Sequence, residues 1–192
     1  MTIVCVITSY GQTTRTEIMS DFQATDNFGN TCYYKITDAT NRYVTLWPSE
    51  KHVKTTYTYT FSGQTFTSVS YSYEGNKSHF NRSGTKGGLP GTVVNPNDGK
   101  TYYVKTVGKL CYSDLVGNSL DTIVVSEGIE DFVDEQAMMW CASSSKVLIL
   151  PSTLKSGSDT FRENWGLKKV VGLEHTQLKR LSDGFFSQCS SV

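Results

Sequence analysis

Alternation of apolar and polar residues is clearest between residues 53 and 73. Apolar and aromatic residues at odd positions alternate with Lys and Thr along residues 53–61, and a second alternating run covers residues 65–73. The Ser-Gly-Gln at 62–64 is expected to form a tight turn between them. Period two is typical of half-buried strands, so the runs predict an antiparallel hairpin with one aromatic and one hydroxyl-rich face. The predicted aromatic face carries Tyr57, Tyr59, Phe61, Val69, Tyr71 and Tyr73.

Other short apolar segments predict more strands and one helix. The hairpin and these segments give about eight strands, spaced as in sandwiches and barrels. Residues 11–30 and 75–91 are polar or Gly-rich and are expected to be loops. Thr160 and Glu163 match a helix capping box, and Phe161 and Trp165 are four residues apart, so one helix is expected to begin near Thr160. The additional strand candidates are residues 3–7, 32–37, 42–47, 102–107, 122–126, 137–141 and 146–150.

Composition fits one all-β domain over residues 1–192. The chain holds 11 Tyr and 9 Phe beside many Thr, Ser and Val, which favour strands. It has 18 basic and 18 acidic residues and a formal net charge of zero, so no electrostatic footprint for nucleic acid is present. No apolar run approaches the length of a membrane span, so membrane insertion is not expected.

Cysteines and glycosylation sequons favour a secreted protein. The five cysteines are spread along the chain without zinc-type spacing, which suits disulfides. Asn76 and Asn81 begin N-K-S and N-R-S sequons in a polar stretch. The first residues lack a basic segment and a long apolar run, so we expect mature sequence, with a truncated leader as the alternative.

The last 90 residues resemble the lipocalins. The segments D-T-I-V-V-S-E-G, E-Q-A-M-M-W-C and K-V-L-I-L-P-S-T-L look like three late barrel strands of that family, and G-L-E-H-T-Q-L-K-R-L followed by Cys189 looks like its C-terminal segment. The similarity is greatest to the insect bilin-binding, crustacyanin and apolipoprotein D branch. The G-x-W motif of the family is not found near the start of the chain.

The resemblance implies an eight-stranded antiparallel up-and-down barrel with one C-terminal helix packed outside. It also implies disulfides joining Cys32 to Cys189 and Cys5 to Cys141, which leaves Cys111 over. The expected function is an extracellular carrier of a small hydrophobic ligand, with a bilin or carotenoid pigment as candidates. The aromatic hairpin face would line the cavity, and Met138 and Trp140 would complete its wall.

Two other classes of function stay open. A secreted β protein could bind a macromolecule through loops, as protease inhibitors do, with residues 84–91 as the candidate loop. An enzyme is not expected, because nucleophile-elbow, zinc-protease and P-loop motifs are absent. Asp131, Asp134 and Glu135 are interpreted as a surface acidic loop. His52 or His79 could ligate haem iron, but all three histidines, His175 included, are expected in exposed loops. A homo-oligomer is compatible with the neutral charge.

Overall fold

The fold consists almost entirely of β-strands. The computed structural model describes residues 11–82, 84–108, 120–132, 138, 145–157, 160–182 and 184–189. The only helix within these ranges is a single 3-10 turn, η1 (Leu173–His175). None of these residues forms a helix with the length and apolar character that a membrane crossing requires. The prediction of a β protein is therefore confirmed.

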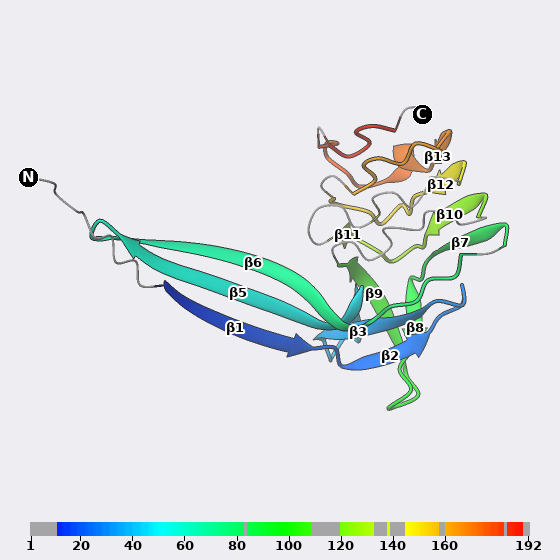
Figure 1. Ribbon diagram of the computed structural model, residues 1–192. Helices are drawn as coiled ribbons and strands as arrows, with labels where there is room; N and C mark the ends of the chain where they lie inside the picture. The colour runs from blue at the N-terminus through cyan, green and yellow to red at the C-terminus, as the bar shows by residue number, and fades with distance from the viewer. Residues whose placement is uncertain are drawn as a thin grey trace, which may run out of the picture.

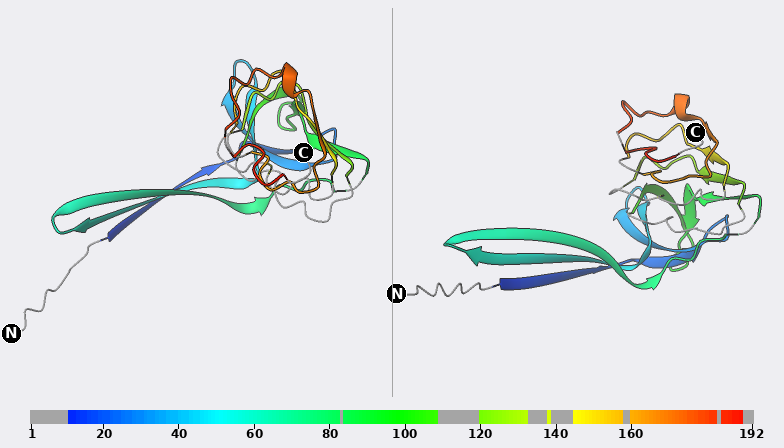
Figure 2. Two further views of the ribbon diagram at one scale, coloured as in Figure 1. Left: turned by 90° about the horizontal axis from the view of Figure 1, so that it is seen from above. Right: turned by 45° about the horizontal axis from the view of Figure 1, so that its top comes forward.

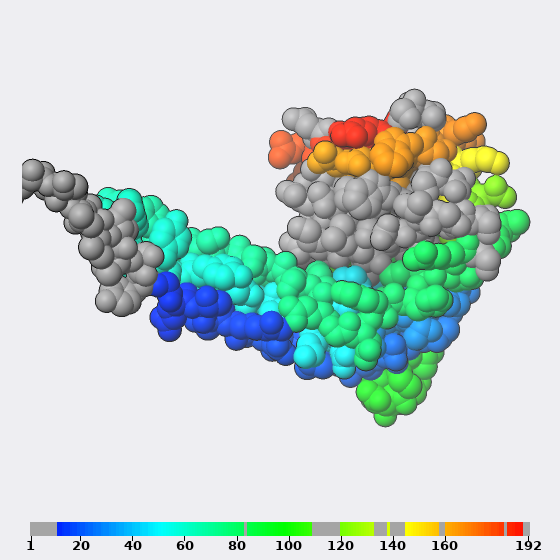
Figure 3. Space-filling model, viewed as in Figure 1, coloured from blue at the N-terminus to red at the C-terminus, as the bar shows by residue number. Residues whose placement is uncertain are grey.

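Three strands form an arm that projects from the body of the molecule (Figures 1 and 3). They are β1 (Gly11–Met19), β5 (Ser49–Phe61) and β6 (Gln64–Lys77), in the sheet order β1-β5-β6. Both pairings are antiparallel. The predicted hairpin is confirmed as β5–β6, whereas β1 occupies a segment that was expected to be a loop.

The body begins with antiparallel strands at the root of the arm. β2 (Phe22–Thr25), β3 (Thr31–Asp38) and β4 (Tyr43–Trp47) pair in sequence order. β4 then pairs in parallel with β9 (Thr101–Val107), and β8 (Thr92–Val94) pairs antiparallel with β9. Pairing becomes parallel from this point toward the C-terminus.

The C-terminal half is a stack of coils that forms a parallel β-solenoid (Figure 2). β7 (Lys86–Leu89), β10 (Thr122–Val125), β12 (Val147–Ile149) and β13 (Lys169–Val171) make one parallel sheet. Ile123 pairs with Leu148, and Leu148 pairs with Val170, so successive coils are 25 and 22 residues apart. Such offsets fall within the range of about 20–50 residues found in solenoid repeats.

A second side of the solenoid repeats the 25-residue offset. β11 (Asp131–Phe132) pairs in parallel with β9, matching Phe132 to Val107. The next coil continues the ladder, since the amide of Lys155 donates to the carbonyl of Glu130 at 2.8 Å. Lys105 and Lys155 place ammonium groups 2.7 and 2.5 Å from the Glu130 carboxylate, and these contacts lower the pKa of that carboxyl. Ion pairs thus join three successive coils.

Packed side chains fill the interior of the stack. Ile123, Leu148, Leu154 and Phe161 are among its buried residues, each at most 2% exposed. Phe161 and Phe185 are 24 positions apart and their rings meet at 5.2 Å, while the Phe161 amide donates to the Phe185 carbonyl. Each coil therefore buries its apolar face on the coils above and below it.

This architecture corrects two predictions. The described strands form three sheets with both parallel and antiparallel pairs, so the closed eight-stranded antiparallel barrel is wrong. The segment beginning at Thr160 forms turns followed by β13, so the helix is also wrong. Of the apolar residues that suggested the helix, Phe161 and Leu167 are buried in the core, whereas Trp165 and Val171 are exposed. The predicted strand at 3–7, and 137–141 apart from residue 138, lie outside the described residues.

Candidate interaction surface

A two-residue turn determines which side chains share a face of the arm. Ser62 and Gly63 have φ angles of 50° and 79°, and Phe61 pairs directly with Gln64. Positive φ at both central residues is characteristic of a type I′ turn, whose twist matches that of a hairpin. Because the loop has two residues, odd positions of β5 pair with even positions of β6.

This register corrects the predicted aromatic face. Tyr57 pairs with Ser68, and Tyr59 pairs with Phe66, whereas Val69 pairs with Thr56 and Tyr71 with Lys54. Paired residues point to the same side of a sheet. Tyr57, Tyr59 and Phe61 therefore lie on one face, and Val69, Tyr71 and Tyr73 lie on the other. The prediction assumed a three-residue turn, which would have matched odd positions with odd positions.

The first face, here called the aromatic face, carries Tyr57, Tyr59, Phe61 and Phe66 together with the polar residues Gln64 and Ser68. Tyr59 and Phe66 stack with ring centroids 5.3 Å apart. All four aromatic side chains are 41–49% exposed, because nothing described packs over this end of the arm. The predicted position of Tyr57, Tyr59 and Phe61 inside a barrel is therefore wrong, because these side chains lie on the outside of a projecting sheet.

The second face, here called the threonine face, consists of Thr56, Thr58, Thr60, Thr65 and Thr67 together with Val69 and Tyr71. Val69 is 43% exposed and Tyr71 is 55% exposed. Hydroxyl groups on this face can bond to water, so it needs no cover. The arm thus presents a more apolar side and a more polar side along the same strands.

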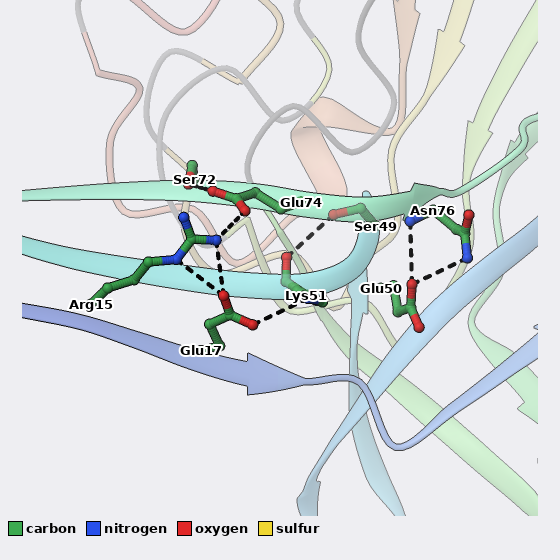
Figure 4. A network of polar contacts seen from close by, with 8 residues as sticks. All are labelled: Arg15, Glu17, Ser49, Glu50, Lys51, Ser72, Glu74 and Asn76. Atoms are coloured by element: carbon green, nitrogen blue, oxygen red, sulfur yellow. Dashed lines mark hydrogen bonds and ion pairs between the residues drawn. The ribbon is translucent and has the colours of Figure 1, made fainter.

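A charged network lies on the aromatic-face side, nearer the body (Figure 4). Glu17 accepts from Arg15 at 2.9 Å and from Lys51 at 3.1 Å, and Arg15 also pairs with Glu74. The hydrogen bond from Lys51 is the main cause that lowers the pKa of Glu17. These groups are solvent-exposed, so the network contributes little stability but joins all three strands.

Aromatic packing anchors the arm to the body. Trp47 ends β4 and is 6% exposed. Its ring meets His52 edge-on at 5.7 Å, and His52 stacks on Tyr73 at 4.8 Å. His52 is therefore part of an aromatic cluster and does not lie in the exposed loop predicted for it. Since this cluster joins β4, β5 and β6, the arm has a packed base.

Met138, the other predicted ligand-site residue that the structure describes, does not lie on the arm. Met138 is fully buried in the solenoid core, and Trp140 lies outside the described residues. His79 forms an isolated bridge with Thr31, and His175 is exposed in η1. No cluster of metal-ligating residues is found within the part of the chain that the structure describes. Asp131 accepts from Ser156, while Asp134 and Glu135 are outside that part.

The predicted disulfide between Cys32 and Cys189 is wrong, because both cysteines are free. Cys32 is buried in β3 at the root of the arm, whereas Cys189 donates to the Phe161 carbonyl in the last coil. The stack of coils separates them. Burial raises the pKa of both thiols. Cys5, Cys111 and Cys141 lie outside the described residues.

The two sequon asparagines differ in environment. Asn76 is exposed on β6 and its amide donates to Glu50 at 3.2 Å (Figure 4). Asn81 is half-buried and its amide donates to the Phe28 carbonyl at 3.1 Å. Both side-chain amides are therefore hydrogen-bonded, and Asn76 is the more accessible because it is more exposed. Glycosylation itself stays a prediction.

A polar cluster beside the arm's root is centred on Asn30, which is fully buried. Its side-chain amide donates to Asp26 at 2.9 Å and to the Gly88 carbonyl at 2.8 Å, and its side-chain oxygen accepts from the backbone N–H of Asn81 at 2.9 Å. Burial raises the pKa of Asp26 despite these donors. A neighbouring open depression of about 260 Å³ is lined by Thr25, Asp26, Asn27, Thr92, Val93, Val94 and Thr101.

Sequence reasoning missed β1 and the charged network, which only strand pairing brings together. Arg15 and Glu17 are two residues apart, as on one face of a strand, and this was the available signal. Comparison with protein-family models, with curated proteins and with solved structures finds no match to this chain.

Proposed function

We propose that this chain is a non-enzymatic interaction protein that uses its projecting arm to dock onto another protein. The solenoid serves as a rigid body in this proposal, and the aromatic face of the arm serves as the contact surface. One observation carries the proposal: large apolar side chains are exposed together on a sheet that packs on nothing described.

The size of the aromatic face supports a contact role. A fully exposed aromatic side chain offers roughly 200 Å², so four that are about half exposed leave roughly 400 Å² of apolar surface. That equals the largest apolar patch of many monomeric proteins, and such patches are often functional. The aromatic rings contribute little to the core, because the core lies in the body.

The packed base of the arm also supports docking. Trp47, His52 and Tyr73 fix the direction of the arm, and ion pairs hold its three strands together. A preorganised surface loses less conformational entropy on binding than a mobile loop does. Aromatic rings near the tip of the projecting arm can contact a partner before the body does.

Photo-cross-linking in the cells that make the protein tests this proposal. A photoreactive phenylalanine replaces Phe61 at the arm tip, and a matched probe replaces the exposed Lys168 on the solenoid. We expect a discrete protein adduct from position 61 that is lost when Tyr57→Thr and Tyr59→Thr are added. The absence of an arm adduct, or equal adducts from position 168, would contradict the proposal.

The apolar-ligand carrier and its secretion stay predictions. They depended on a barrel cavity and on disulfides, and no observation here favours them over docking. Mass spectrometry of material extracted from the natural protein tests for a bound bilin, carotenoid or other lipid.

A further inference from the structure

The outer edge of the arm is a long strand without the usual protection against pairing. β6 ends the sheet order β1-β5-β6, so one of its edges has no strand beside it among the described residues. Residues 64–72 contain no charge, proline or glycine. Natural edge strands normally carry such residues, or a bulge, to prevent edge-to-edge association. The only irregularity in the β5–β6 register lies near the body, between Ser49 and Lys51.

The turn identifies which backbone groups face outward from this edge. Phe61 and Gln64 close the hairpin, and in an antiparallel ladder every second pair exchanges hydrogen bonds. Gln64, Phe66, Ser68 and the following even positions therefore bond to β5. The N–H and C=O groups of the odd positions, including Thr67, Val69 and Tyr71, point away from the sheet.

We propose that β6 pairs antiparallel with β6 of a second copy of this chain, centred on Val69. This inference rests on the proposed function, because it names a protein that the arm binds, and it assigns that contact to the edge of β6 beside the aromatic face. A two-fold axis normal to the sheet matches odd positions with odd positions, so outward-facing groups meet each other. Val69 then lies opposite Val69 of the partner subunit, and Thr67 lies opposite Tyr71 of the partner subunit.

The side chains suit this register. Aromatic and β-branched residues form favourable cross-strand pairs, and like charges opposite each other would destabilise the ladder. In this register Glu74 lies opposite Gln64 of the partner subunit, so no like charges meet directly. The chain also has zero net charge, so two copies do not repel each other over long distances. The two arms would form one six-stranded sheet.

The area of the contact determines how strong the dimer is. A nine-residue ladder is about 30 Å long and a sheet edge is about 10 Å thick, so each copy covers roughly 300 Å². Stable interfaces cover about 800 Å² per partner. The expected dimer is therefore weak and depends on concentration.

Light scattering with size-exclusion chromatography of the full chain tests the pairing. We expect the mass to rise from the monomer value of 21.3 kDa toward twice that value as concentration increases to the millimolar range. Val69→Lys places two ammonium groups opposite each other, and Val69→Glu places two carboxylates there. Each variant should stay monomeric, whereas an equimolar mixture should recover the dimer. Val69→Thr, which keeps a β-branched side chain, is the matched control and should dimerise like the unchanged protein.

Three results would overturn the proposal. The unchanged chain could stay monomeric at every concentration, the charged variants could dimerise as well as Val69→Thr, or their mixture could fail to recover the dimer. Circular dichroism of each variant should match that of the unchanged chain, which excludes misfolding as the cause. If the chain is monomeric while position 61 still captures a protein, self-pairing is wrong and the proposed docking function stands.

Discussion

Replacing Asn30 by alanine should destabilise the protein far more than the size of the side chain suggests. Asn30 lies in the connection from β2 to β3, and its side chain joins this connection to Asn81 and Gly88, which are more than 50 residues away in sequence. Both amide hydrogens and the amide oxygen are used, so the side chain is fully satisfied. The Asn30→Ala variant would leave the Gly88 carbonyl, the Asp26 carboxylate and the Asn81 amide without these partners.

The magnitude follows from how far water can reach each group. Leaving a buried polar group unpaired costs about 1–3 kcal/mol. The Gly88 carbonyl is in a buried strand and is expected to contribute about 2 kcal/mol, whereas Asp26 and Asn81 are half-buried and would contribute about 0.5–1 kcal/mol each. The free energy of unfolding should therefore fall by about 3 kcal/mol.

Urea denaturation followed by circular dichroism measures this change. Asn41→Ala is the matched control, since Asn41 donates to Asp38 at 2.8 Å in an exposed turn of similar chemistry. That variant should lose less than about 1 kcal/mol, because water replaces the lost partner. If both variants lose the same free energy, the argument that Asn30 joins the β2–β3 connection to β7 of the solenoid is refuted.

Four further predictions concern the solenoid and its cysteines. Gly88→Ala would place a methyl group into the Val124 carbonyl of the next coil, so it should lower the free energy of unfolding by about 3 kcal/mol in a urea titration. Gly11→Ala is the control: Gly11 has open space around it, so this variant should change the free energy of unfolding by less than about 0.5 kcal/mol. Glu130→Gln should remove about 1 kcal/mol at neutral pH by breaking two ion pairs. Lysine contacts hold the folded pKa of Glu130 below its ordinary 4.5, so the stabilisation is present above pH about 5 and is lost as pH falls through the folded pKa. The urea midpoints of the unchanged protein and of Glu130→Gln should therefore converge on acidification. A difference that stays constant with pH would contradict this cause. Mass spectrometry after alkylation without reduction should find Cys32 and Cys189 as free thiols. Cys32 should be alkylated only after unfolding, because it is fully buried. Recovery of a disulfide-linked Cys32–Cys189 peptide would contradict the fold.

Local patterns were sufficient to predict two of the three arm strands, β5 and β6, but not β1. Alternation along residues 53–61 and 65–73 predicted β5 and β6 correctly, since a strand exposes successive side chains on opposite sides. Which residues of β5 and β6 share a face depends instead on the length of the turn between the two strands. One residue more or less in the turn exchanges the faces of one strand relative to the other, and Ser62 had to adopt positive φ for the two-residue turn to form.

The solenoid depends on contacts between residues 22 to 25 positions apart, which local sequence patterns do not reveal. Its coils share only general features: Ile123, Leu148 and Val170 align in the sheet, and Ser158-Asp159-Thr160-Phe161 resembles Ser182-Asp183-Gly184-Phe185 at a spacing of 24. Each short strand by itself could belong to a barrel or a sandwich, since an apolar run of three to five residues does not say whether its neighbour is parallel. Whether neighbouring strands are parallel is decided only by the tertiary structure. In it, each strand pairs with the strand of the next coil. The same stacking of coils places the core inside the body, so the arm lies outside the core and its aromatic side chains are exposed.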